Sequence, residues 1–108
     1  MAPRRALLLL SIALAVLPAA AQQRMIPADA KRGFVKHERE ALVSIDGAPA
    51  RLAPGATIRD SRNLIIVPAA MPREGAWADY VLDRGGQVFR VWLLSDEERT
   101  RPRPAAAR

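Results

Sequence analysis

The stretch AWADYVLDRGGQVFRVWLL, residues 76–94, decides the fold class. Its two halves, 76–83 and 87–94, alternate in character and flank Arg84-Gly85-Gly86, which predicts a β-hairpin with a two-residue turn at the glycines. One face of that hairpin is then wholly apolar or aromatic, with Ala76, Ala78, Tyr80, Leu82, Phe89, Val91 and Leu93. The buried face selects the register of a hairpin, so we expect this face to line the core.

The opposite face of the hairpin carries two tryptophans. It consists of Trp77, Asp79, Val81, Asp83, Val88, Arg90, Trp92 and Leu94. Exposed apolar clusters mark partner surfaces, and tryptophan is enriched in binding hot spots. The pattern therefore predicts a partner surface formed by Trp77, Val81, Arg90 and Trp92, on which Trp92→Ala changes partner binding more than folding. The alternative is that the N-terminal arm, a terminal helix or another strand covers this face.

Short strands separated by turns fill the region before the hairpin. Asp46-Gly47 predicts a type I′ turn between two strands, and Pro49 places the return strand at an edge or a bulge. Pro54-Gly55 predicts a further turn. The continuous apolar run 64–67 predicts a central strand buried on both faces. The expected strands are 33–39, 42–45, 48–52, 57–59, 64–67 and the two halves of the hairpin.

This rhythm of strands and turns is typical of a small all-β domain with five or six strands, built as a barrel or a sandwich. The segments VSIDGAPARLAPGATIRD and WADYVLDRGGQVFRVWLL resemble small exported β-barrel proteins of proteobacteria, of the oligonucleotide/oligosaccharide-binding (OB) or SH3-like kind. The resemblance covers roughly residues 41–94. It implies a fold and a compartment, and it carries over no functional residue.

The N-terminus predicts export. Arg4 and Arg5 precede the apolar run ALLLLSIALAVL, and Pro18-Ala19-Ala20-Ala21 supplies an A-x-A cleavage site, so residues 1–21 read as a signal peptide that forms a helix. The apolar run is shorter than the roughly 20 residues of a membrane span, although an uncleaved anchor is the alternative. We expect a periplasmic or secreted product with no stable membrane anchor after cleavage. The chain has no cysteine, which excludes lipid attachment at a cysteine after the cleavage site.

The remaining chain divides into a linker at 22–32, a β-domain at 33–95, and a short helix with a basic tail at 96–108. Ser95 followed by Glu98 predicts a capping box, and Pro102 limits the helix to about two turns. The net charge of +6 comes mostly from arginines in the signal peptide and the tail, and the domain itself is nearly balanced. Binding of nucleic acid is therefore not favoured by the overall charge.

No pattern in the sequence predicts catalysis, a cofactor or a metal. His37 is the only histidine, and with Glu38 and Glu40 it does not reach the three or four ligands of a metal site. No cysteine or second histidine is present to activate a serine. Asp79 and Asp83 are expected to be ordinary exposed carboxylates near Arg90.

These observations predict a periplasmic binding module without enzymatic activity, whose partner is a protein or a glycan of the cell envelope. The alternative is an OB-like barrel that binds nucleic acid or glycan, with Arg51, Arg59, Arg62 and Arg90 as its basic residues. Export makes nucleic acid the less expected of these ligands.

Overall fold

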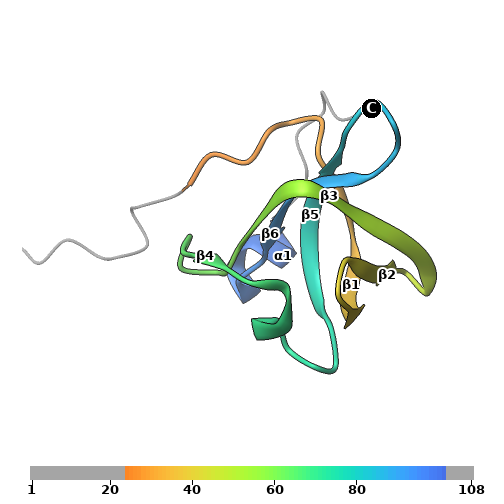
Figure 1. Ribbon diagram of the computed structural model, residues 1–108. Helices are drawn as coiled ribbons and strands as arrows, with labels where there is room; N and C mark the ends of the chain where they lie inside the picture. Colours follow the sequence, from red (N-terminus) through yellow and green to blue (C-terminus); the bar gives the residue numbers. More distant parts are fainter. Residues whose placement is uncertain (1–23, 102–108) are drawn as a thin grey trace, which may run out of the picture.

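The computed structural model describes residues 24–101, which form a mostly β domain with a short helix near the end of that range (Figure 1). The predicted signal helix and the tail beyond residue 101 lie outside the described residues. Six strands form one sheet: β1 (Lys31–Arg39), β2 (Leu42–Ile45), β3 (Ala48–Arg59), β4 (Ile65–Ile66), β5 (Ala76–Leu82) and β6 (Val88–Leu93). A 3₁₀ turn, η3 (Pro68–Ala70), follows β4, and the helix α1 (Asp96–Thr100) follows β6.

The turn between β2 and β3 confirms the first predicted hairpin. Asp46 and Gly47 have φ angles of 52° and 87°, as a type I′ turn requires, and Ile45 pairs with Ala48. Pro49 pairs with Ser44 on one side, while the pairing of β3 with β6 begins only at Leu52. The edge of β3 opposite β2 is therefore unpaired at Pro49, which is where a residue without an amide proton fits.

The hairpin of β5 and β6 has the predicted register along most of its length. Ala78 pairs with Leu93 and Val81 with Arg90, so Ala78, Val91 and Leu93 are buried as expected. The turn is different from the prediction. The amide of Gly86 donates to the carbonyl of Asp83, and the Asp83 carboxylate accepts the amides of Gly85 and Gln87. This aspartate-centred turn replaces the expected glycine turn.

A β-bulge near the turn shifts the register at the tip of the hairpin by one residue from the predicted register. Leu82 pairs with Val88 instead of Phe89, and the shift lies between Val81 and Leu82. Val88 therefore points into the core, and Phe89 turns outward although it was predicted to be buried.

The strand β3 is longer than predicted. Pro54-Gly55 does not separate two strands, because β3 continues from residue 48 to residue 59 with an irregularity between Leu52 and Thr57 in its pairing with β6. The strand order is β2-β1-β5-β6-β3-β4, and β2 also pairs with β3, so the pairing returns to the strand where it began. The β3–β6 pairing is parallel and all the others are antiparallel.

The prediction for residues 64–67 was wrong. Only Ile65 and Ile66 form a strand, β4, which lies at the end of the sheet and pairs with the last residues of β3. Leu64, Ile65 and Val67 are more than half exposed. An unbroken apolar run indicates burial on both faces only if a second strand and a covering layer are present, and neither lies beside β4 within residues 24–101.

The core lies between the inward faces of the paired strands. Its buried members are Val35, Val43, Leu52, Ile58, Met71, Ala78, Val88, Val91 and Leu93. The capping box of α1 is confirmed, since the Ser95 hydroxyl accepts the Glu98 amide and the Glu98 carboxylate accepts the Ser95 amide. β1 begins at Lys31, two residues before the predicted domain boundary.

Candidate functional site

The four residues of the predicted partner surface all lie on the outer side of β5 and β6, but they do not form one exposed face. Trp77 is 39% exposed, whereas Trp92 is only 7% exposed. Val81 is partly buried and pairs with the exposed Arg90. The prediction that Trp92 contributes to a surface is therefore wrong. At Trp92 the alternative holds, in which other segments of the chain cover this face of the hairpin.

Segments from both ends of the described chain lie over the centre of the hairpin. We call them the cover: Arg24 of the N-terminal arm, Arg32 of β1, and α1. Asp79, which pairs with Trp92, is buried and accepts two hydrogen bonds from the guanidinium of Arg32, at 2.7 and 3.2 Å. The same guanidinium donates to the carbonyls of Arg99 and Arg101 at the end of α1. Asp79 was expected to be exposed near Arg90, but Arg32 on β1 is its partner.

Arg24, in the predicted linker, joins the N-terminal arm to the helix. Its side chain is 8% exposed and contacts both oxygens of Glu98, at 2.9 and 3.0 Å. It also donates to the carbonyls of Asp60, at 2.6 Å, and Leu93, at 2.5 Å. Four hydrogen bonds to three separate segments make this arginine part of the fold.

Hydrogen bonds and neighbouring charges in the cover shift the pKa values of Arg32 and Glu98 in the directions that favour their charged forms. The hydrogen bond with Asp79 outweighs burial and raises the pKa of Arg32. Burial on its own would raise the pKa of Glu98, but the hydrogen bonds and charge of Arg24, with the Ser95 amide, hold that pKa below its ordinary value. The cover is thus stabilised by two ionic contacts at neutral pH.

Two uncovered patches remain on either side of this centre. At one end, Trp77 packs edge-on against Phe34 of β1, with ring centroids 5.6 Å apart. At the other end, the bulge places Phe89 in solvent at 39% exposure, and the Arg90 guanidinium lies 5.5 Å from the centre of its ring. We call this second group, Val81, Phe89 and Arg90, the bulge patch. Four residues of strand, about 13 Å, separate Trp77 from Val81.

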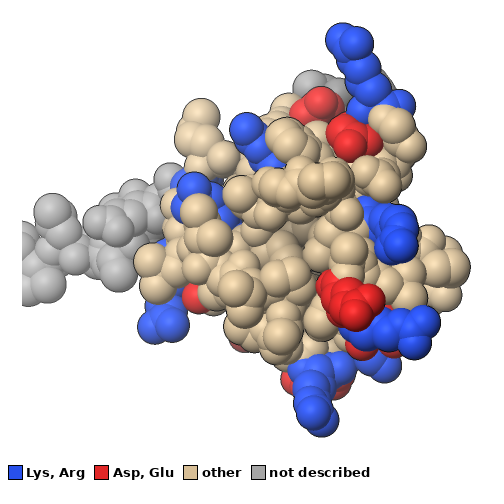
Figure 2. Space-filling view, in the orientation of Figure 1, with Lys and Arg blue, Asp and Glu red and all other residues tan. Residues whose placement is uncertain are grey.

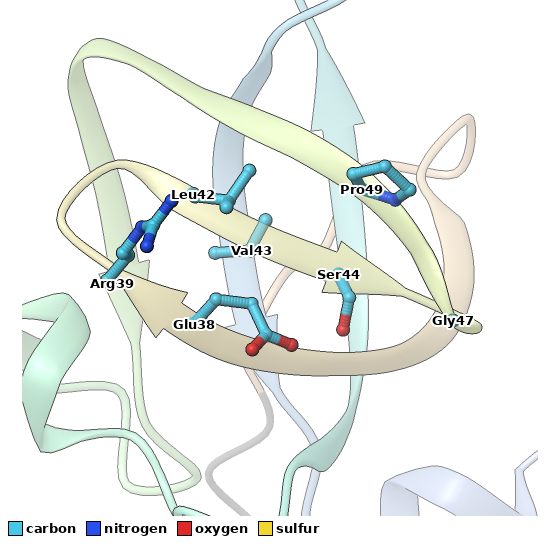
Figure 3. A pocket seen from close by; sticks show the side chains of 7 residues that line it. All are labelled: Glu38, Arg39, Leu42, Val43, Ser44, Gly47 and Pro49. Carbon is cyan, nitrogen blue, oxygen red and sulfur yellow. The ribbon is translucent and has the colours of Figure 1, made fainter.

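A shallow hollow of about 450 Å³ lies on a different face, around the β1–β2 hairpin and the start of β3 (Figure 3). Figure 3 shows Leu42, Val43 and Ser44 on β2 between Glu38 and Arg39 on one side and Pro49 on the other. Its lining consists of Glu38, Arg39, Leu42, Val43, Ser44, Gly47 and Pro49. Both signs of charge, a hydroxyl and an aliphatic side chain thus border the same small space.

Sequence reasoning missed the exposure of Leu82 and Phe89, which were predicted to be buried, and of Leu64, Ile65 and Val67. Asp83 was the residue from which the exposure of Phe89 could have been predicted. Its side chain favours an aspartate turn, which shifts the strand register at the tip of the hairpin. No sequence signal distinguishes an exposed apolar edge from a buried strand over four residues.

His37 forms one hydrogen bond, between its Nε2 and the carbonyl of Glu40 in the turn of the β1–β2 hairpin. Among residues 24–101 no group of three or more potential ligand side chains surrounds a metal position.

No family model, curated protein or solved structure matches this chain. Within the described range, no helix has the length and hydropathy needed to span a membrane.

Proposed function

We propose that this chain is an exported binding module without enzymatic activity, and that it binds a protein of the cell envelope through the bulge patch. The observation that carries the proposal is the outward position of Phe89 beside Arg90. A bulge that turns an aromatic side chain from a core position into solvent costs burial energy, and bulges commonly re-aim side chains toward functional surfaces.

The chemistry of the bulge patch suits a protein partner. Phenylalanine supplies a rigid apolar anchor, and arginine supplies a charged group that stacks and donates hydrogen bonds. Arg90 has no acidic partner among the described residues, so its charge remains available. The predicted export signal at residues 1–21 supports the compartment, and a sequence with a single histidine and no cysteine supports the non-enzymatic role.

A matched pair of variants tests this proposal. The exported protein is immobilised, exposed to an envelope extract of the producing cells, and its bound proteins are identified by mass spectrometry. We expect Phe89→Ser/Arg90→Ser to lose the partner that the wild type retains, while Arg84→Ser, an exposed arginine in the adjacent turn, keeps it. Equal recovery from the wild type and the double variant would overturn the bulge patch as the binding surface.

The alternative is an OB-like barrel that binds an oligosaccharide on the β1–β2–β3 face. Two observations favour it. The pairing order returns from β3 to β2 with β3 parallel to β6, which is the order we expect of an OB barrel, and OB barrels use the face of their second and third strands for ligands. The hollow of Figure 3 lies on that face and offers polar contacts from Glu38, Arg39 and Ser44.

Nucleic acid fits this face less well. Arg59 and Arg62 do not line the hollow, and they already have partners, since Arg59 donates to the carbonyl of Asn63 and Arg62 lies 3.9 Å from Asp60. Glu38, by contrast, brings a negative charge to the hollow. Titration with envelope glycan fragments and with single-stranded DNA at low salt separates the two ligands. Ser44→Tyr, which fills the hollow, is expected to abolish glycan binding. Saturable DNA binding that Ser44→Tyr also abolishes would make nucleic acid the ligand of this face.

A further inference from the structure

Among residues 24–101, the most exposed large apolar side chains after Met25 lie together in the segment 64–67. Leu64, Ile65 and Val67 are 56%, 60% and 64% exposed. They lie at β4, the last strand in the sheet order, to the left in Figure 1. Figure 2 shows that the molecular face around β4 and η3 is largely without charged side chains, while side chains of both charges stand around its rim.

The outer edge of β4 also carries unpaired backbone groups. The amide of Asp60 donates to the carbonyl of Leu64, and Ile58 pairs with Ile66. In an antiparallel pair, residues alternate between facing the partner strand and facing away from it. The N–H and C=O of Ile65 therefore point away from β3, and no other strand of residues 24–101 pairs with that edge.

Exposed edge strands normally carry a charge, a proline or a pronounced bulge that prevents pairing with another strand. Residues 63–67, Asn-Leu-Ile-Ile-Val, carry no charge and no proline, and the only such devices here are the two-residue length of β4 and Pro68 just after the segment. Three consecutive β-branched residues, Ile65, Ile66 and Val67, preceded by Leu64 and without a charge, instead favour the addition of a strand.

We propose that a second copy of this chain occupies the edge, so that two β4 strands pair antiparallel across a two-fold axis at Ile65. The two Ile65 residues then exchange both of their outward hydrogen bonds, and Leu64 of each copy faces Ile66 of the other. The side chains of both Ile65 residues meet on one face of the joined sheet, with each Val67 diagonal to the other copy's Ile65. Such β-branched cross-strand contacts are favourable.

Charge and solvation favour this occupant over two others. The paired segments bring no charge opposite another charge, because residues 63–67 are uncharged and Arg62 lies beyond them. A lipid surface would leave the N–H and C=O of Ile65 without hydrogen bonds, at a cost of several kcal/mol per group. A foreign strand would be selected by charges or side-chain pockets along the edge, and this edge offers only apolar, self-complementary side chains.

The predicted dimer is weak. Two short strands bury far less than the roughly 1,600 Å² of a standard interface, so we expect the dimer to form only at high protein concentration. The inference goes beyond the proposed function, since it uses neither the bulge patch nor the hollow.

Sedimentation equilibrium of the exported protein over a concentration series tests the inference. We expect wild-type dimerisation, and a loss of at least about tenfold in affinity for Ile65→Lys, which places two like charges at the axis. Phe89→Lys, which adds the same charge to an exposed apolar residue of the bulge patch, should dimerise as the wild type does. A monomeric wild type at 1 mM, or equal dimerisation of Ile65→Lys, would overturn the proposal.

Disulfide crosslinking tests the register in which the two β4 strands pair. Because the chain has no cysteine, Ile65→Cys introduces a single thiol. Hydrogen-bonded antiparallel pairs have Cα atoms about 5.5 Å apart, within disulfide range, so mild oxidation should give a covalent dimer. Ala69→Cys, exposed in η3, serves as the control and should crosslink far less. Equal crosslinking of both variants, or binding of monomeric wild type to phosphatidylglycerol vesicles that Ile65→Lys abolishes, would refute pairing of two copies.

Discussion

At the scale of single residues, the ionic cover over the hairpin gives the clearest consequence. Arg24 and Glu98 lie 74 positions apart in the sequence and are joined by two hydrogen bonds. Nothing in the linker sequence distinguishes Arg24 from the arginines of the tail, and so its role could not be predicted. The same holds for Asp79, whose partner on β1 becomes adjacent only when the sheet forms.

The lowered pKa of Glu98 predicts an acid-dependent loss of stability. A carboxylate whose folded pKa lies below its ordinary value of 4.5 contributes stability that is complete above that value and is lost as the pH falls through the folded pKa. We therefore expect Glu98→Gln to be less stable than the wild type at pH 6 and the difference to narrow at pH 3. Urea unfolding midpoints at both pH values measure this, and parallel losses in the two proteins would contradict it.

At the scale of elements, turn chemistry decided which predictions were confirmed. The Asp46-Gly47 hairpin was predicted because two adjacent residues suited to positive φ allow one turn type. The tip of the second hairpin was predicted incorrectly, because the Asp83 side chain accepts the amides of Gly85 and Gln87 and so determines the turn in place of Gly85-Gly86. One residue of bulge then moved Phe89 out of the core and created the bulge patch. The candidate site thus depends on a local feature that the alternating pattern concealed.

Gly75, just before β5, predicts a large difference between two glycine substitutions. Both Gly75 and Gly47 have positive φ, at 98° and 87°, so alanine at either position costs roughly 1–2 kcal/mol in backbone strain. A Cβ at Gly75 would also collide with the Phe34 ring, whereas nothing lies within 4 Å of one at Gly47. We expect Gly75→Ala to lower the free energy of unfolding by at least about 1 kcal/mol more than Gly47→Ala. Equal urea midpoints for the two variants would show that the ring moves aside freely.

At the scale of the whole molecule, the sequence indicated the class but not the arrangement of strands. Alternation and turns report neighbours along the chain, and they predicted a small, mostly β domain with a terminal helix. The parallel pairing of β3 with β6 joins residues 33 to 36 positions apart, such as Arg59 with Trp92 and Leu52 with Val88, and no local pattern reports it. The contacts beside Trp92 are equally non-local, since they join Arg24 of the N-terminal arm and Arg32 of β1 to β6 and α1.

This cover predicts that the end of the chain controls the environment of Trp92. In a Trp77→Phe background, Trp92 is the only tryptophan, and its burial should give a blue emission maximum. Truncation after Leu94 removes α1, the Glu98 carboxylate and the carbonyls that bind Arg32. We expect red-shifted emission and stronger acrylamide quenching while the far-ultraviolet circular dichroism of the sheet remains. Truncation after Arg101 should leave the emission unchanged, because α1 and its contacts are intact. A sheet that persists with blue, unquenched Trp92 after truncation at Leu94 would mean that the strands alone bury the indole.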